Sequence, residues 1–260
     1  MINILFIGDI CGKLGREAVK KNIPLLKEKY AIDFIVANGE NTTHGRGLSY
    51  SHYKELMDYG INCITMGNHF FGVEEIIRSN EKYTNLIRPL NLPEKIPGTG
   101  TKVFTVKGKT VQITNLLGVS EINFMGQNNP FTCIDNLLST NKSDIHIIDF
   151  HAEATGEKGA LARFVDGKVS AVIGTHTHVQ TNDARILPLG TGLLSDVGAC
   201  CAYNSILGMN SDEVISRNAY GIPKRFFTPS TGPKQFNAVI LMFNDEMKLT
   251  EFKLISDISQ

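Results

Sequence analysis

The sequence predicts an α/β fold in which two β-sheets pack together beneath helices. Short apolar runs alternate with amphipathic stretches along most of the 260 residues, a pattern typical of sheets covered by helices. The last two apolar segments, 236–243 and 247–255, alternate and flank a turn at Asn244-Asp245, which predicts an antiparallel hairpin. Parallel and antiparallel pairing in one chain therefore indicates more than one sheet.

The remaining elements follow from hydrophobic spacing. Strands are expected at 2–7, 34–37, 63–66, 103–106, 111–115, 145–150, 171–174 and 193–195. Helices are expected at 16–30, 50–59, 73–79 and 134–138. The polar, Asn-rich stretch 120–130 is expected to be a loop. We expect a single domain over 1–260, in which the Gly- and Pro-containing segment 199–233 forms a loop-rich cap, lid or interface.

Composition excludes several classes of protein. The 26 Lys and Arg balance the 26 Asp and Glu, so a stable complex with nucleic acid is not expected. The 5 cysteines include no Cys-x-x-Cys pair, which favours reduced thiols over disulfides or a zinc knuckle. No apolar run approaches the ~20 residues of a membrane helix, and the first residues read as a strand rather than a signal peptide. We therefore expect a cytoplasmic protein without a membrane partner.

Polar, chemically versatile side chains follow five of the expected strands. These strand ends are Gly8-Asp9, Asn38-Gly39-Glu40-Asn41, Gly67-Asn68-His69, His151 and Gly174-Thr175-His176-Thr177-His178. Ligands of α/β proteins bind at the carboxyl ends of strands, and glycine beside these groups allows sharp turns and close approach. The pattern thus places a candidate site at one edge of the sheets.

The residues at these strand ends are suited to metal binding. The candidate ligands are Asp9, Glu40, Asn41, Asn68, His151, His176 and His178. Imidazole suits transition metals and oxygen ligands suit harder ions, so one bridging carboxylate in such a set can hold two divalent ions about 3.5–4 Å apart. If Thr177 points away in an extended segment, His176 and His178 reach the same side.

Each motif alone has a structural explanation. Asp9 could cap a helix, Glu40-Asn41 could form a turn, and Asn68-His69 could cap the following helix. His151 alone would more often be a core histidine. Their joint occurrence favours a metal site, because each strand end would otherwise need its own separate cause.

The first loop does not belong to either common nucleotide-binding motif. The stretch 8–14 has one residue too few between its glycines for a phosphate loop, and Leu14 replaces the magnesium-binding Ser/Thr. It also lacks the Gly-x-Gly-x-x-Gly spacing. We interpret it as the start of the first helix, with Arg16 as a solvated helix residue.

The sequence resembles a known family over nearly its whole length. The stretches IGDICGKLGR, NGENTTHGRG, TMGNHFFG, DFHAEATGEK, GTHTHVQTND and SDVGA, followed by ILGM, resemble the YmdB-like family of bacterial calcineurin-type metallophosphoesterases. The resemblance implies a four-layer α/β/β/α fold with a small cap. It also implies two metal ions, iron or manganese with zinc or magnesium as alternatives, and hydrolysis of phosphodiesters, notably 2′,3′-cyclic nucleotides to 3′-nucleotides.

The resemblance also implies a role for each site residue. One metal would take Asp9, Glu40, Asn41 and His178, and the other would take Glu40, Asn68, His151 and His176, so that Glu40 bridges. His69 would be the catalytic histidine beside the leaving group. Cys11 stands where the wider superfamily has a histidine; it could ligate a metal, although a buried, inert thiol is the simpler interpretation.

The implied mechanism uses a hydroxide formed between the two metals, with His69 assisting the leaving oxygen. His44 could contact the phosphate or be an exposed loop histidine. Asp149, Glu153 and Asp196 are candidates for orienting the ligand imidazoles. The alternatives are a nucleotidase-type phosphomonoesterase and a metal-dependent, nucleotide-binding regulatory protein. A homo-oligomer is expected from the family likeness alone.

Overall fold

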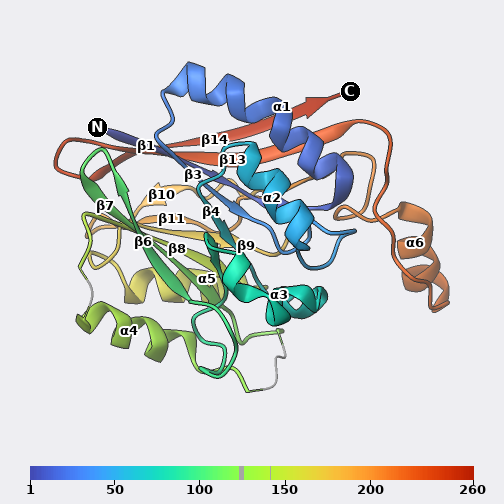
Figure 1. Cartoon of the computed structure of the whole chain (residues 1–260), viewed down its shortest axis with the longest axis horizontal. Coiled ribbons are helices and arrows are strands. Elements are labelled where there is room, and N and C mark those ends of the chain that lie inside the picture. Colours follow the sequence, from blue (N-terminus) through green and yellow to red (C-terminus); the bar gives the residue numbers. More distant parts are fainter. Residues whose placement is uncertain (123–125, 141) are drawn as a thin grey trace.

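The computed structural model describes residues 1–122, 126–140 and 142–260. Two sheets lie face to face, and helices cover their outer faces, so that the chain forms four layers in the order α/β/β/α (Figure 1). This arrangement confirms the predicted fold class.

The first sheet is mixed. Its strand order is β2 (Asp9–Ile10), β12 (Ala199–Ala202), β13 (Lys234–Phe243), β1 (Ile2–Ile7), β3 (Phe34–Asn38), β4 (Cys63–Thr65) and β5 (Leu86–Ile87), and β14 (Leu249–Ser259) also pairs with β13. Strands β1, β3, β4 and β5 are parallel, whereas β13 is antiparallel to β1 and β14. The predicted C-terminal hairpin is therefore confirmed.

The second sheet is also mixed. Its order is β10 (Arg185–Ile186), β11 (Gly192–Leu194), β9 (Ala171–Thr175), β8 (Ile145–His151), β7 (Lys109–Leu117) and β6 (Thr101–Val106). Strands β7, β8, β9 and β11 are parallel, and β6 and β7 form an antiparallel hairpin. Strand β8 lies near the middle of this sheet, where both faces are covered.

Helices α1 (Gly12–Tyr30) and α2 (Tyr50–Asp58) pack on the first sheet, and α4 (Pro130–Thr140) and α5 (Thr155–Phe164) pack on the second. Strand β1 shows why its sequence is continuously apolar. Leu5 and Ile7 face the helices, whereas Ile4 and Phe6 face the other sheet. A strand buried on both faces has no polar side to present.

Several expectations were wrong in detail. The helix expected over 73–79 is a single turn, α3 (Glu75–Arg78), between the 3₁₀ turns Phe70–Gly72 and Asn80–Lys82. Helix α5 was not predicted from the sequence. Its buried face contains a lysine, Lys158, beside Leu161 and Ala162, and this charge interrupts the apolar spacing that indicates a helix. Arg16 is not solvated: its side chain is 13% exposed and its Nε lies 2.9 Å from Glu55.

The segment 199–233 is more regular than expected. It begins with strand β12, whose four small residues are too few to show a strand pattern in the sequence. It also contains helix α6 (Ser211–Tyr220). Helix α6 stands away from the four layers at one end of the molecule (Figure 1). In the part of the chain that the structure describes, no helix has the length and apolarity needed to cross a membrane.

Candidate metal centre

The carboxyl ends of strands from both sheets meet at one buried cluster. Asp9 lies in β2 just after β1, Glu40 and Asn41 follow β3, Asn68 and His69 follow β4, His151 ends β8, and His176 and His178 follow β9. The structure thus brings together every residue that the sequence placed in the two metal groups, together with His69. Both sheets contribute, so the cluster forms only when they pack.

Glu40 lies at the centre of the cluster and is 1% exposed. Its Oε1 atom is 3.2 Å from His151 Nε2 and 3.3 Å from His69 Nδ1. Its Oε2 atom accepts the backbone N–H of His69 at 2.9 Å. The Oε1 atom also accepts from Asn41 Nδ2 at 3.2 Å, so Glu40 contacts both His151 and Asn41, which suits a bridging position.

One group of candidate ligands surrounds His151. Its Nε2 atom lies 3.0 Å from His176 Nδ1 and 2.9 Å from Asn68 Oδ1. The ligating atoms of Glu40, His151 and His176 all lie within 4.8 Å of one another, a spacing that can hold a metal ion. This group matches one of the two sets implied by the family resemblance.

A second group also adjoins Glu40, because its member Asn41 donates through Nδ2 to the Oε1 atom of Glu40. Asn41 Nδ2 is 3.1 Å from His178 Nε2, which in turn is 3.9 Å from Asp9 Oδ1. The side chain of Asp9 is fully buried, and its Oδ1 atom has no hydrogen-bond partner in the described chain. Since an unsatisfied buried carboxylate oxygen is costly, this atom fits a site for a cation.

The charges of the cluster also favour a bound cation. Burial raises the pKa of Asp9. Burial would also raise the pKa of Glu40, but His151 holds it well below its usual range. Despite its own burial, His151 has a pKa raised to about 9 by Glu40, Asp9 and Asp149. These carboxylates attract positive charge, and a metal would take the place of the proton, because a ligating imidazole must be neutral.

Gly67 is required for the close packing of this site. A Cβ atom at this position would lie 2.4 Å from Glu40 Oε2 and 2.3 Å from His151 Cδ2. Any other residue would therefore displace both groups. The glycine before Asn68 is explained by this contact rather than by backbone flexibility.

Buried partners hold the histidines in place. His151 Nδ1 lies 2.9 Å from Thr175 Oγ1, which donates to Asp149 at 2.7 Å. His176 Nε2 lies 3.0 Å from Glu153. Such partners orient metal-binding imidazoles and tune their basicity.

The loop between His176 and His178 is anchored by an ion pair. Thr177 turns away from the cluster and bonds Asp196 through both its backbone N–H and its hydroxyl. Asp196 also accepts from Lys158 Nζ at 2.9 Å, and both side chains are buried. The two histidines adopt left-handed backbone angles, with φ of 104° and 66°, and this anchoring keeps the strained loop in place.

Two other residues singled out in the sequence have no side-chain hydrogen bond or ion pair with the clustered residues in the described chain. His44 is exposed, and its ring lies 6.1 Å from that of His52. The thiol of Cys11 is buried with Ala199 and Cys201, and burial raises its pKa. This placement agrees with the interpretation of Cys11 as an inert thiol.

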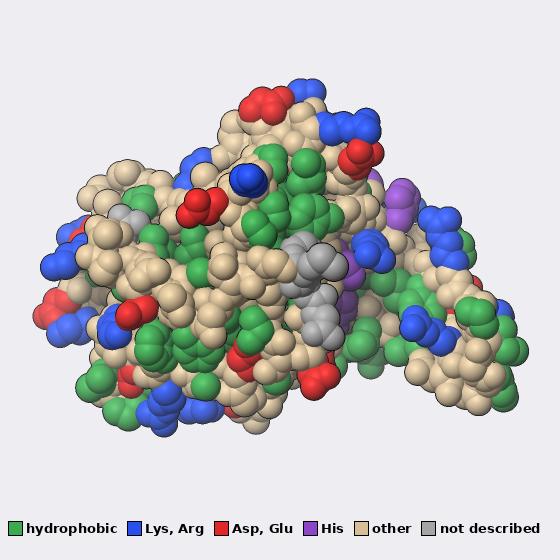
Figure 2. Space-filling view, turned by 90° about the horizontal axis from the view of Figure 1, so that it is seen from below, with side chains coloured by type: hydrophobic (Ala, Val, Ile, Leu, Met, Phe, Trp, Pro, Cys, Tyr) green, Lys and Arg blue, Asp and Glu red, His purple; other side chains and the backbone are tan. Residues whose placement is uncertain are grey.

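A cavity of about 380 Å³ opens beside the cluster. It is lined by Arg46, Asn68, His69, Phe71, Gly72, Glu121, Ile122 and His176. Figure 2 shows this face of the molecule, with histidines at a hollow between the body and the lobe at its right-hand end. Arg46 was missed in the sequence, although its position between Gly45 and Gly47, shortly after Glu40, was an available signal.

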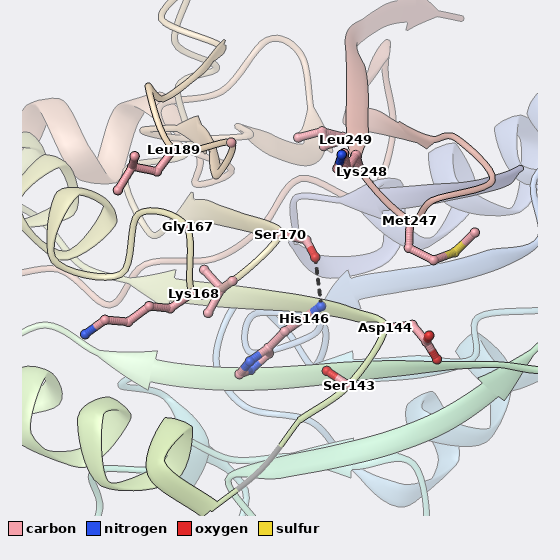
Figure 3. A pocket seen from close by; sticks show the side chains of 12 residues that line it. Ser143, Asp144, His146, Gly167, Lys168, Ser170, Leu189, Met247, Lys248 and Leu249 are labelled. Carbon is pink, nitrogen blue, oxygen red and sulfur yellow. Dashed lines mark hydrogen bonds between the residues drawn. The ribbon is translucent and has the colours of Figure 1, made fainter.

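Another cavity, of about 430 Å³, lies at the other end of β8 (Figure 3). Two of its lysines, Lys168 and Lys248, are paired with Asp135 and Glu246. His146 is buried beside it and lies 2.8 Å from the hydroxyl of Thr114. Burial lowers the pKa of His146 from 6.5 to about 4.

His146 is expected to make the fold sensitive to acid. Between pH 6.5 and 4 the unfolded chain binds a proton at this residue that the folded chain excludes, so stability falls as pH falls. This pKa shift corresponds to a loss of about 3 kcal/mol in the free energy of unfolding between pH 7 and pH 4. Urea unfolding in the presence of a chelator should therefore show that the free energy of unfolding falls less between pH 7 and pH 4 for His146→Gln than for the wild type. The exposed His44→Gln variant is the control. Equal losses in all three proteins would contradict this role.

Comparison with known proteins agrees with the geometry. The model of a family described as YmdB-like protein matches residues 5–255. The chain belongs to the YmdB-like family. The resemblance seen in the sequence motifs is thereby confirmed over nearly the whole chain.

Relatives of this YmdB-like chain include proteins with named activities. It is 42% identical to a 2′,3′-cyclic-nucleotide 2′-phosphodiesterase of Bacillus subtilis over 95% of the chain and 93% of that protein. The crystal structure of a phosphatase from Mycoplasma pneumoniae superposes with a TM-score of 0.93 at 37% identity, covering 99% of this chain and 93% of that one. A Haemophilus influenzae NAD nucleotidase shares only the fold, with a TM-score of 0.57 at 15% identity over 99% of this chain and 56% of that one.

Proposed function

We propose that this YmdB-like chain is a two-metal phosphodiesterase that hydrolyses 2′,3′-cyclic nucleotides to 3′-nucleotides. Its family and its relatives make it a hydrolase of phosphoric esters. The observation that carries the finer proposal is the central position of Glu40 between two groups of ligands, with His69 at the adjoining cavity.

Two divalent ions would be held by the residues already described. Asp9, Glu40, Asn41 and His178 would hold one ion, and Glu40, Asn68, His151 and His176 would hold the other. When bound, the ions supply charge neutralisation and make a water molecule nucleophilic at neutral pH. Mixed nitrogen and oxygen ligands suit iron or manganese, with zinc and magnesium as alternatives.

His69 would protonate the leaving oxygen. Its Nδ1 atom lies 2.7 Å from Asn41 Oδ1, and its backbone N–H is bound to Glu40. Its side chain is 28% exposed at the cavity, whereas that of His151 is fully buried. With Nδ1 engaged, Nε2 is the nitrogen that remains for the substrate.

The proposed reaction breaks the bond between phosphorus and the ribose O2′. Water supplies the oxygen that joins phosphorus and releases a proton, O2′ takes a proton from His69, and His69 regains one from solvent, which leaves a 3′-phosphate. General acid assistance of this kind is worth ~10²–10⁴-fold in rate. Asn68 precedes His69 directly, so one loop presents both a ligand and the acid.

We also propose that the enzyme works in the cytoplasm, as a homo-oligomer acting on a small nucleotide. The free thiols of Cys11, Cys63, Cys133, Cys200 and Cys201 support a reducing compartment. The family likeness supports the oligomer.

One experiment tests the proposed function. Purified protein would be analysed for bound metals and then assayed against 2′,3′-cyclic nucleotides and nucleoside monophosphates, with products identified by chromatography. We expect about two equivalents of a transition metal and formation of 3′-nucleotides. Preferential turnover of monophosphates would favour a nucleotidase, and tight nucleotide binding without turnover would favour a regulatory protein; either result contradicts the proposal.

A further inference from the structure

Arg46 lines the same cavity as three residues of the candidate centre, Asn68, His69 and His176. It is exposed and belongs to the loop that directly follows Glu40 and Asn41. The cavity also has an apolar side, formed by Phe71 and Ile122. A guanidinium at this position shares the substrate's space with the proposed general acid.

The loop that carries Arg46 is tied to the candidate ligands. The backbone N–H of Gly45 donates to the carbonyl of Asn41 at 3.1 Å, and that of Gly47 donates to the carbonyl of Glu40 at 2.5 Å. The N–H of Arg46 itself donates to Thr43 at 3.0 Å. The backbone of Arg46 is therefore held at a set distance from the metal centre.

A close backbone contact brings this loop against the segment that follows His69. A Cβ atom at Gly72 would lie 2.8 Å from the backbone nitrogen of Gly47 and 2.9 Å from Cγ of Arg46. The absence of a side chain at Gly72 thus lets the stem of Arg46 pack beside the 3₁₀ turn Phe70–Gly72. Arg46 packed in this way is one of the residues that line the cavity.

The positive charge of Arg46 is not neutralised within the described chain. No carboxylate there forms an ion pair with it, although Glu121 lines the same cavity. Arg16, Arg78 and Arg185 pair with Glu55, Glu74 and Asp183, whereas other arginines of the described chain are also without an ion pair, so the position of Arg46 in the cavity is what sets it apart. An arginine without a partner, in a cavity beside buried ligands, is suited to binding an anion.

We propose that Arg46 binds the phosphate group of the substrate and forms an anion subsite beside the metal centre. The guanidinium would hold a non-bridging phosphate oxygen while the centre holds the rest of the group. Arginine is suited to this task because its planar donors match phosphate oxygens. The identity of the substrate as a cyclic nucleotide rests on the proposed function, whereas anion binding by Arg46 does not.

The test compares Arg46→Gln, Arg46→Lys and the wild type, all loaded with metal. Arg163→Gln is the matched control, because Arg163 is an exposed arginine on α5, outside the lining of this cavity. Metal content, kcat and KM for 2′,3′-cyclic AMP, and the Kd of inorganic phosphate by calorimetry would be measured. Loss of a charge-assisted hydrogen bond predicts a rise of about 10- to 100-fold in KM and in phosphate Kd for Arg46→Gln.

Arg46→Lys should recover part of this loss, and metal content should be unchanged in every variant. A phosphate Kd for Arg46→Gln within twofold of the wild type and of the Arg163→Gln control would overturn the proposal. Failure of the wild type to hydrolyse cyclic AMP would instead refute the proposed function, and the phosphate measurement would still decide the role of Arg46.

Discussion

Replacement of Glu40 by glutamine is expected to remove most of the bound metal and to lower turnover by about 10³-fold or more. Glu40 is the residue proposed to belong to both ligand groups, and its Oε1 atom contacts both His151 and Asn41. Glutamine keeps the shape but loses the charge that balances a cation. Several kcal/mol of charge stabilisation would be lost, and each 1.36 kcal/mol is about tenfold in rate.

The measurement pairs elemental analysis with kcat for a cyclic nucleotide. Glu74→Gln is a suitable control, because Glu74 is an exposed residue whose only described ion pair is with Arg78. We expect the control to keep both its metal and its activity. A full metal complement in Glu40→Gln would show that another residue bridges the site.

Replacement of His69 by alanine should separate chemistry from metal binding. His69 contacts Glu40 and Asn41 but lies at the cavity rather than in the buried centre. We expect metal content to stay at the wild-type level while kcat for a cyclic nucleotide falls by ~10²–10⁴-fold. This loss is the contribution of a general acid to expulsion of a poor leaving group.

The choice of leaving group sharpens this test. An ester of p-nitrophenol releases a stable phenolate that needs no proton, so the defect of His69→Ala should shrink with bis(p-nitrophenyl) phosphate. His44→Ala serves as a control for removal of an exposed histidine from the neighbouring loop. A defect of equal size on both substrates would show that His69 does not act as the acid.

The candidate ligands could be found in the sequence because their signals are local. Asp9, Glu40 and Asn68 each follow a short apolar strand and stand beside a glycine, and His176 stands two residues after Gly174. Strand ends are set by neighbouring residues, and parallel strands bring their carboxyl ends to one edge. The proposed two-metal roles stay predictions, but the convergence of these residues is observed.

Other features had no local signal. The burial of Lys158 against Asp196, the anchoring of Thr177 and the position of Arg46 in the cavity each depend on residues distant in the sequence. A lysine in a helix reads as solvated until a buried carboxylate is known to face it. His44 and Arg46 belong to the same loop, and only the structure shows that Arg46 lines the cavity and packs beside Gly72.

The hydrophobic period and the glycine placement, which act over a few residues, therefore determined the α/β class with two packed sheets, the main strands along the chain and the residues that end them, and the family resemblance added the four layers. The tertiary structure decided how the two sheets face each other, which oxygen of Asp9 has no hydrogen-bond partner and that the cationic side chain of Arg46 lines the cavity. Those features arise from packing between segments far apart in the chain, and burial and charge at such contacts are properties of the assembled site.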